Sequence, residues 1–149
     1  MIKERFKLIP TVYLILTKDN KILLSRRYNT GFHDGEYSLP AGHLHGENET
    51  LKQAMVREAK EEVRVEMDLA DLELVHVMHR SQQEPTNERR VNFFFMAKKW
   101  KGEPRIVEPN KCDDLRWVEF GKMPNNTIHY IKQVINCFRN NITYSEYGF

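Results

Sequence analysis

Three glutamates and an arginine fall within the six residues REAKEE, numbered 57–62. At about 100° per residue, Glu58, Glu61 and Glu62 occupy roughly a third of a helix circumference, and apolar side chains occupy another side. Like charges at i,i+4, as in Glu58 and Glu62, destabilise an isolated helix unless a cation is bound between them. Oxygen ligands without a nearby histidine favour Mg²⁺ or Mn²⁺ over zinc. The stretch therefore predicts a divalent-cation site on one helix face.

A solvated helix face is the plainer interpretation of the same residues. Such a face normally mixes charges, so that each acid meets a base. Here Lys60 points away from the acidic group, and only Arg57 lies beside it. The charge pattern therefore favours the cation site over the solvated face.

The elements that must position this helix can be read from the apolar pattern. We expect a hairpin from TVYLILT (11–17) and ILLSRR (22–27), then a loop crossed by a short strand at YSLP (37–40). A first helix is predicted from Thr50 to about Val63, and a second from about Asn126 to Asn140. Further strands are expected at residues 72–80, 90–100 and 113–120, with the polar loop SQQEPTNE before the second of them and a tail, NNITYSEYGF, that is ordered or frays. The order predicts an α/β fold with a mixed sheet packed between helices.

Length and charge limit the classes of protein that the chain can represent. A chain of 149 residues, 40% hydrophobic, predicts one domain over residues 1–149. Lys and Arg exceed Asp and Glu by only 23 to 21, which argues against a stable nucleic-acid partner. Without a membrane-spanning run or a secretory signal, we expect a cytoplasmic protein with no membrane partner. Cys112 and Cys137 are expected to be reduced and uninvolved.

The stretch around the acidic helix resembles the signature box of the Nudix hydrolase family, the MutT-like enzymes. That box is a Gly, five residues, Glu, seven residues, then Arg-Glu-apolar-x-Glu-Glu-x-Gly-apolar. The positions that match it are Gly42, Glu49, Arg57, Glu58, Ala59, Glu61, Glu62 and Val65. SLPAGH before the box and WKGEP, DDLRWVEF and MPNN after it extend the resemblance less specifically.

Two positions depart from the box. Six residues separate Gly42 from Glu49, which leaves open whether Glu47 or Glu49 takes the place of the loop glutamate. Arg64 stands where the box has the glycine that ends the helix, so it would bear left-handed strain of about 1 kcal/mol or let the helix end differently.

The resemblance implies a Nudix-type α/β/α sandwich that hydrolyses a nucleoside diphosphate linked to another group, X, with Mg²⁺ or Mn²⁺. It implies that Glu58, Glu61, Glu62 and the carbonyl of Gly42 hold metal. Glu58 or a neighbouring glutamate would deprotonate the attacking water, and Arg57 would orient a glutamate. A simple surface ion pair is the other interpretation of Arg57.

Three further roles follow from MutT-like nucleoside triphosphatases. Glu108 corresponds to an additional loop glutamate at the metal, against a solvated glutamate. Arg27, at the end of a strand, would face the phosphates or the base, against a role as an ordinary polar strand end. Asn126 would contact a base edge, against a role as a helix N-cap.

Other chemically able side chains are expected to lie outside the site. His43 and His45 would share a face of an extended segment near the metal, but the family does not need them. His76 and His79 are predicted to be ordinary strand residues. The run FFF at residues 93–95 is predicted to be mainly core, with one ring as a candidate for stacking on a base.

The substrate is the main question that the sequence leaves open. The short segment before the first strand favours a nucleoside triphosphate cleaved to monophosphate and pyrophosphate, as in sanitation of damaged nucleotides. The alternatives are an ADP-ribose or nucleotide-sugar pyrophosphatase, a nucleotide-binding regulator that does not cleave its ligand, and an RNA-decapping factor. The regulator is disfavoured because the box acids are retained, and the decapping factor because basic patches are short. A homodimer remains open.

Overall fold

The computed structural model describes residues 3–82 and 86–149, and part of the predicted loop SQQEPTNE (residues 83–85) lies outside them. The strands are β1 (Ile9–Ile15), β2 (Thr17–Lys18), β3 (Lys21–Arg27), β4 (Tyr37–Ser38), β5 (Ala41–His43), β6 (Leu72–Arg80), β7 (Arg90–Ala97), β8 (Cys112–Glu119) and β9 (Tyr144–Tyr147). The helices are α1 (Leu51–Val63) and α2 (His129–Arg139), with short 3₁₀ turns at Leu69–Asp71 and Phe120–Lys122.

The strands form two sheets. The first has the order β5-β1-β7-β6-β9, in which β1 runs parallel to β7 and antiparallel to β5. The second contains β2, β3 and β4, and β8 pairs with β3. The first sheet contains both parallel and antiparallel pairs, so it is mixed, as the sequence predicted.

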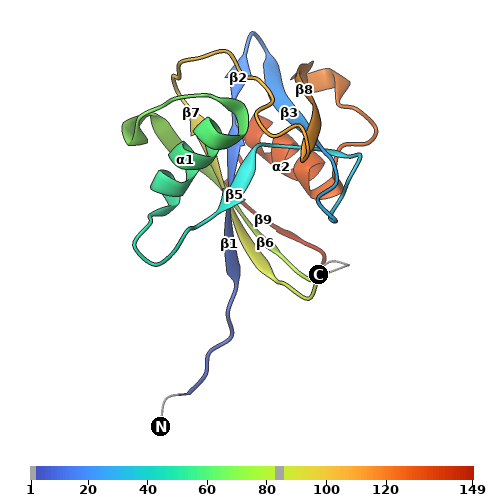
Figure 1. Ribbon diagram of the computed structural model, residues 1–149. Helices are drawn as coiled ribbons and strands as arrows, with labels where there is room; N and C mark the ends of the chain where they lie inside the picture. The colour runs from blue at the N-terminus through green and yellow to red at the C-terminus, as the bar shows by residue number, and fades with distance from the viewer. Residues whose placement is uncertain (1–2, 83–85) are drawn as a thin grey trace.

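The two helices cover opposite sides of β1 (Figure 1). Alternate side chains of a strand point to opposite faces of its sheet. Val12 and Leu14 accordingly belong to the core cluster of α1, whereas Tyr13 and Ile15 belong to that of α2. The α1 cluster includes Ala54, Met55, Ala59 and Val63, and the α2 cluster includes Ile131, Val134 and Ile135. The predicted α/β/α sandwich is confirmed.

Helix α1 begins and ends with local signals. Thr50 is the N-cap, and its side chain and that of Gln53 form a reciprocal capping box. Arg64 follows the last turn in the left-handed conformation, with φ 63°, and its N–H donates to the carbonyls of Ala59 and Lys60. The helix therefore ends as a glycine-capped helix would, but with an arginine in the glycine position.

Helix α2 begins at His129, three residues later than expected, and Ile128 rather than Asn126 occupies its N-cap position. The N-cap interpretation of Asn126 was therefore wrong. The Asn126 side-chain amide instead donates to the backbone carbonyl of Gly35 at 2.9 Å. The backbone carbonyl of Asn126 accepts from the Tyr37 N–H at 2.9 Å. These bonds attach the turn before the helix to the segment around Gly35 and Tyr37.

The C-terminal tail forms a strand that the sequence analysis did not identify. Strand β9 pairs in parallel with β6. Buried His76 on β6 anchors it, because its ring nitrogens lie 2.8 Å from the carbonyl oxygen of Ile142 and 2.7 Å from Oγ of Ser145. His76 is thus a structural strand residue, as predicted.

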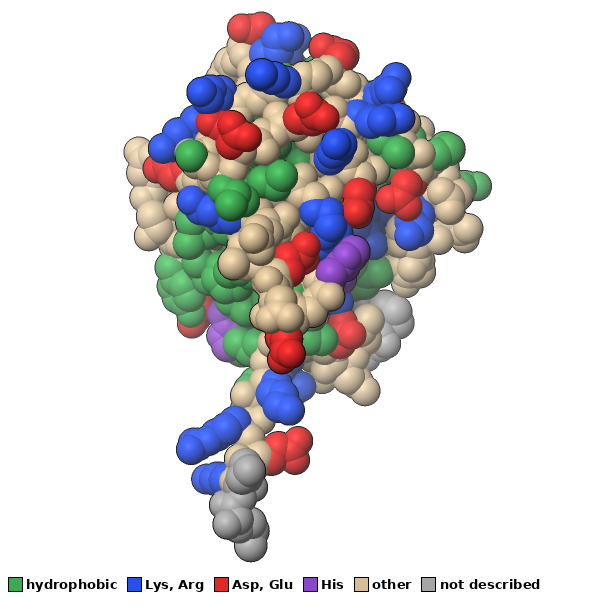
Figure 2. All heavy atoms as spheres, turned by 60° about the vertical axis from the view of Figure 1, so that its left-hand side comes forward, with side chains coloured by type: hydrophobic (Ala, Val, Ile, Leu, Met, Phe, Trp, Pro, Cys, Tyr) green, Lys and Arg blue, Asp and Glu red, His purple; other side chains and the backbone are tan. Residues whose placement is uncertain are grey.

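The segment before β1 projects from the body of the molecule (Figures 1 and 2). Its Phe6 side chain is 74% exposed. None of the described residues of this segment lines the cavity discussed below. Within the described part of the chain, no helix is both long and apolar enough to cross a bilayer.

Candidate active site

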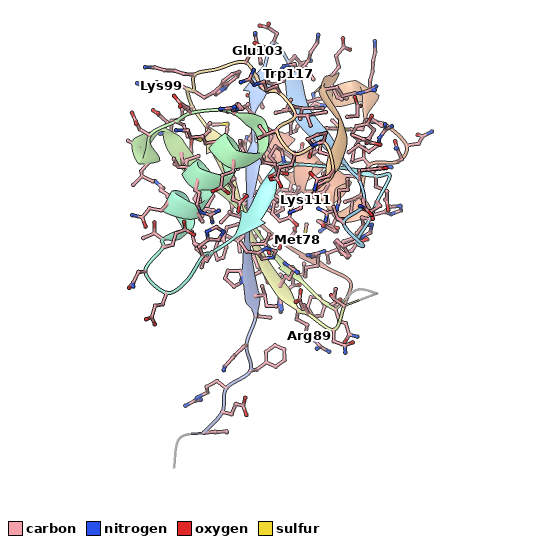
Figure 3. The ribbon with its side chains drawn as sticks, viewed as in Figure 1. Met78, Arg89, Lys99, Glu103, Lys111 and Trp117 are labelled. Atoms are coloured by element: carbon pink, nitrogen blue, oxygen red, sulfur yellow. The ribbon has the colours of Figure 1, made fainter. Side chains whose placement is uncertain are left out.

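A cavity of about 550 Å³ opens beside β1, within the size range of small-molecule sites. Residues from β1, β3, β5, β6, β7, both helices and the connecting loops line it. Its charged lining residues are Arg26, Arg27, Glu58, Glu62, Arg80, Glu88, Arg90, Glu108 and Lys111. Lys111 is labelled between α1 and α2 in Figure 3. The cavity therefore brings together carboxylates and cations from strands of both sheets and from both sides of β1.

Gly42 and Glu58 meet where β5 passes under α1. The pairing of Gly42 with Val12 places β5 at the edge of the first sheet, against the helix. A Cβ atom on Gly42 would lie only 2.1 Å from Cδ of Glu58. A side chain at position 42 would therefore displace the Glu58 carboxylate.

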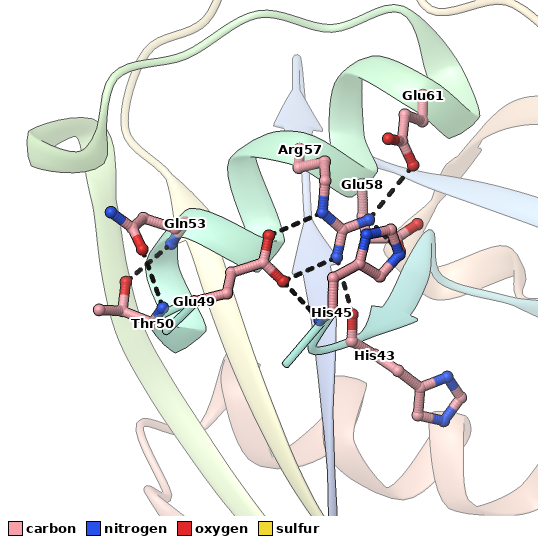
Figure 4. A network of polar contacts seen from close by, with 8 residues as sticks. All are labelled: His43, His45, Glu49, Thr50, Gln53, Arg57, Glu58 and Glu61. Carbon is pink, nitrogen blue, oxygen red and sulfur yellow. Dashed lines mark hydrogen bonds and ion pairs between the residues drawn. The ribbon is translucent and has the colours of Figure 1, made fainter. Parts of the chain in front are cut away.

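The Arg57 guanidinium is the hub of the polar network in Figure 4. Its Nε and Nη2 donate to the two carboxylate oxygens of Glu49, at 2.7 and 3.0 Å. Its Nη1 donates to Glu58 at 2.8 Å and to Glu61 at 3.2 Å, and Nη2 also donates to the carbonyl of His43 at 2.8 Å. One side chain thus connects the loop, the helix and β5, which exceeds a simple surface ion pair.

Glu49, and not Glu47, is the loop glutamate in contact with Arg57. It also accepts a hydrogen bond from the His45 N–H at 2.8 Å. Arg57 is the main reason that the pKa of Glu49 falls to about 2. Glu47 is exposed to solvent. The extra residue is accommodated in the turn before the helix, and the spacing from Glu49 to Arg57 is preserved.

Glu62 and Glu58 carry the perturbed carboxyl groups of the cavity. The pKa of Glu62 is raised to about 8, mainly by burial and in part by the charges of Glu58 and Glu108, while one hydrogen bond from the Ala41 N–H at 3.0 Å opposes the shift. Burial also raises the pKa of Glu58, although its pairing with Arg57 opposes the shift. Carboxylates that disfavour one another's charge are suited to hold a cation.

The donor set fits a divalent cation in its chemistry, although the side chains are not gathered around one point. Among residues 3–82 and 86–149, no three His, Cys, Asp or Glu side chains are close enough to hold a metal ion. Glu61 is half exposed and paired with Arg57, and Glu62 is hydrogen-bonded to the backbone. Glu58, Glu62 and the Gly42 backbone nevertheless offer only hard oxygen donors, the type that Mg²⁺ and Mn²⁺ prefer.

The remaining predicted site residues divide into two groups. Glu108 and Arg27 line the cavity; Glu108 lies 3.5 Å from Lys111, and Arg27 donates to the carbonyl of Phe32 at 2.6 Å. Asn126 is not among the described residues that line the cavity. Its role at a base edge therefore remains a prediction without support from this geometry.

The predictions for the FFF run and for His43 and His45 can be compared with the residues that line the cavity. Phe94 and Phe95 are buried, and Phe93 packs against the core, so this run is core and none of its rings lines the cavity. His43 and His45 do line it, and Nε2 of His43 lies 2.5 Å from the Arg90 guanidinium, which leaves this ring facing a cation.

Sequence reasoning missed the wall formed by Phe32, Arg80 and Tyr130. These residues come from the β3–β4 loop, the end of β6 and the start of α2. Arg80 ends the predicted strand LELVHVMHR, and no sequence pattern singled it out. Only the packing of distant segments brings it to the cavity.

Comparison with known proteins places this fold in one family. The NUDIX domain model matches residues 7–135. A MutT NUDIX hydrolase from Burkholderia pseudomallei has a similar structure, with a TM-score of 0.78 and 24% identity over 88% of this chain and 98% of that one. The NUDIX domain of Shewanella oneidensis NrtR, in a complex with ADP ribose, gives a TM-score of 0.72 and 22% identity over 93% of this chain and 91% of that one.

One relative has a higher sequence identity to this chain, over a shorter stretch. An ADP-ribose pyrophosphatase from Methanocaldococcus jannaschii is 47% identical over 62 residues, which are 40% of this chain and 36% of that protein. The chain belongs to the Nudix hydrolase family, as the family model establishes. Members of this family generally use divalent metal ions.

Proposed function

We propose that this protein hydrolyses a nucleoside diphosphate linked to a group X, with Mg²⁺ or Mn²⁺, and that a nucleoside triphosphate is cleaved to monophosphate and pyrophosphate. The observation that supports this proposal is the pair of Glu58 and Glu62 in a cavity that also contains cationic side chains. Burial is the main cause of the raised pKa of each carboxyl group. The implied partner is therefore a small-molecule nucleotide, held by carboxylates through a cation and by basic groups directly.

The side chains divide the work of the reaction. Glu58 accepts the proton of the attacking water, because its carboxylate lines the cavity and Nη1 of Arg57 holds it at 2.8 Å. Arg57 holds Glu58 and Glu61 in position by donating to both. A divalent cation at Glu58, Glu62 and the Gly42 carbonyl, with Glu61 and Glu108 as further ligands, would neutralise phosphate oxygens and make water a better nucleophile. Arg27, which lines the cavity from β3, binds a phosphate of the substrate.

An ADP-ribose or nucleotide-sugar pyrophosphatase is the second candidate. The relative from M. jannaschii is named for ADP-ribose, and the Shewanella domain was solved with it. Both reactions break a diphosphate bond, so the carboxylate end of the site serves either substrate. The two candidates differ in X, which is a phosphate in a triphosphate and an uncharged ribose in ADP-ribose.

A substrate panel tests the proposal. Purified protein is incubated with nucleoside triphosphates, ADP-ribose and nucleotide sugars, with Mg²⁺, with Mn²⁺ and with a chelator, and the products are separated chromatographically. We expect cation-dependent release of nucleoside monophosphate, abolished in Glu58→Gln and retained in the matched variant Glu66→Gln, whose side chain is exposed beyond the helix end. Absence of turnover on every substrate would contradict the proposal.

A further inference from the structure

Arg80 is a buried arginine without a carboxylate partner in the described structure. It lines the cavity and is only 3% exposed. Its guanidinium carbon lies 4.2 Å from the ring centre of Tyr130 and 5.6 Å from that of Phe32. Within the described residues its Nε has no hydrogen-bond partner. The guanidinium is therefore held by ring faces while donors remain unused.

The other cations of the cavity are engaged differently. Arg26, Arg90 and Lys111 pair with Asp113, Glu88 and Glu108 respectively. Arg27 donates to two neutral oxygens, the Phe32 carbonyl and the Thr30 hydroxyl. Arg27 and Arg80 are thus the cavity-lining cations for which the described structure shows no carboxylate within ion-pair distance.

An uncompensated buried charge requires a physical explanation. Stacking on aromatic faces recovers less free energy than removing an ion from water costs. The planar fork of an arginine pairs best with a carboxylate or a phosphate, to which it donates two parallel hydrogen bonds. A neutral acceptor would satisfy the N–H groups but leave the charge unbalanced.

We propose that Arg80 binds an oxyanion carried by the X group of the substrate, a phosphate or a carboxylate, and so selects substrates in which X is charged. This inference rests on the proposed function and names its substrate class. The Glu58 carboxylate extends from α1, whereas Arg80 stacks on Tyr130 of α2, the helix on the opposite side of β1. Because Arg80 and Glu58 enter the cavity from different elements, the proposal assigns the Arg80 anion to X and the cation at the carboxylates to the diphosphate.

A substrate comparison in Arg80→Gln tests the selection. For a nucleoside triphosphate we expect KM to rise at least tenfold with little change in kcat, and for ADP-ribose we expect KM to stay within a factor of two. Arg80→Lys, which keeps the charge without the fork, should give an intermediate KM. An equal rise for both substrates, or no rise for either, would overturn the proposal.

Arg89→Gln is the matched control, because Arg89 precedes β7, does not line the cavity and lies far from Lys111 in Figure 3. It should leave both KM values unchanged. Glutamine is shorter than arginine and fills less of the space between the rings. Arg80→Met is therefore the second variant, and unfolding midpoints of all variants are recorded. Methionine removes the charge but fills the space, so its KM values should match those of the glutamine variant.

A binding measurement separates this inference from the proposed function. Metal-free protein is titrated calorimetrically with inorganic pyrophosphate and, separately, with succinate. We expect at least one to bind, with affinity lowered tenfold or more in Arg80→Gln and unchanged in Arg89→Gln; which one binds identifies phosphate or carboxylate. Binding that depends on Arg80 without nucleotide turnover would refute the proposed function alone. Absence of Arg80-dependent binding of either ion would refute the inference, whatever the enzyme hydrolyses.

Discussion

Gly42 and Glu58 are in such close contact that a methyl group on the Gly42 Cα would overlap the Glu58 carboxylate, 2.1 Å from its Cδ. We expect Gly42→Ala to shift that carboxylate and lower kcat/KM by about 100-fold, the usual effect of a misplacement of about 1 Å at a reacting group. Gly121→Ala is the control, since no atom lies within 4 Å of a Cβ there. Turnover and thermal midpoint are measured for both variants. Full activity in Gly42→Ala would show that Glu58 need not be where this structure places it.

The ion pair between Glu49 and Arg57 should give stability that depends on pH. Arg57 lowers the pKa of Glu49 from 4.5 to about 2, so the pair contributes fully above 4.5 and is lost as the pH falls through about 2. We expect Glu49→Gln to lower the unfolding midpoint near neutral pH and to approach the wild type in acid. Denaturant titrations across this pH range measure the difference.

Glu47→Gln is the control for that experiment, because its side chain is exposed two residues away on the same loop. It should match the wild type at every pH. If Glu47→Gln were the destabilised variant, Glu47 and not Glu49 would be the loop glutamate that pairs with Arg57.

Glu62 should make metal-free protein less stable as the pH rises. Its pKa is raised from 4.5 to about 8, so the folded state retains a proton that the unfolded state releases, and stability declines between these two values. We expect Glu62→Gln to remove this decline and to abolish most turnover with Mg²⁺. Glu61→Gln should also reduce turnover but leave the pH profile of stability unchanged.

Thermal midpoints recorded without metal across neutral and mildly alkaline pH measure the decline, and Mg²⁺ added at each pH measures its reversal. We expect the Mg²⁺-induced increase in midpoint to grow with pH, because the cation competes with the Glu62 proton. The same pH profile in wild type and Glu62→Gln would refute the origin of the decline. Unchanged turnover in both the Glu61 and Glu62 variants would refute the metal assignment.

The sequence was sufficient for elements whose signals are local. The helix-forming composition that follows Thr50, the apolar face of α1 and the apolar run of β1 each depend on neighbouring residues, and these elements were predicted to within a few positions. The acidic face of α1 was also local. Glu58 and Glu62 reach the cavity from it, whereas Glu61 lies outside the cavity lining, paired with Arg57.

Features that depend on distant partners could not be predicted in the same way. Strand β9 is polar and short, and it exists because β6 offers an open edge and His76 anchors it. The start of α2 shifted because Asn126 bonds to the loop at Gly35 rather than capping the helix. Arg80 becomes a site candidate only when β6, the β3–β4 loop and α2 are packed together.

Arg64 provides the last prediction, because it occupies the left-handed position after α1 with φ 63° and ψ 27°. A left-handed conformation costs a residue with a Cβ about 1–2 kcal/mol, whereas glycine adopts it freely but loses about 0.5–1 kcal/mol of additional chain entropy on folding. We therefore expect Arg64→Gly to raise the free energy of unfolding by up to about 1 kcal/mol, with turnover unchanged.

Arg64→Ala separates strain from charge. Alanine keeps the Cβ and loses the exposed guanidinium, so its stability should stay close to that of the wild type while the glycine variant rises. Denaturant midpoints and KM are measured on the same preparations. A tenfold increase in KM for Arg64→Gly at unchanged stability would mean that Arg64 contacts the substrate. Equal stabilisation by alanine and glycine would instead mean that removal of the positive charge, and not relief of left-handed strain, is what stabilises this end of the helix.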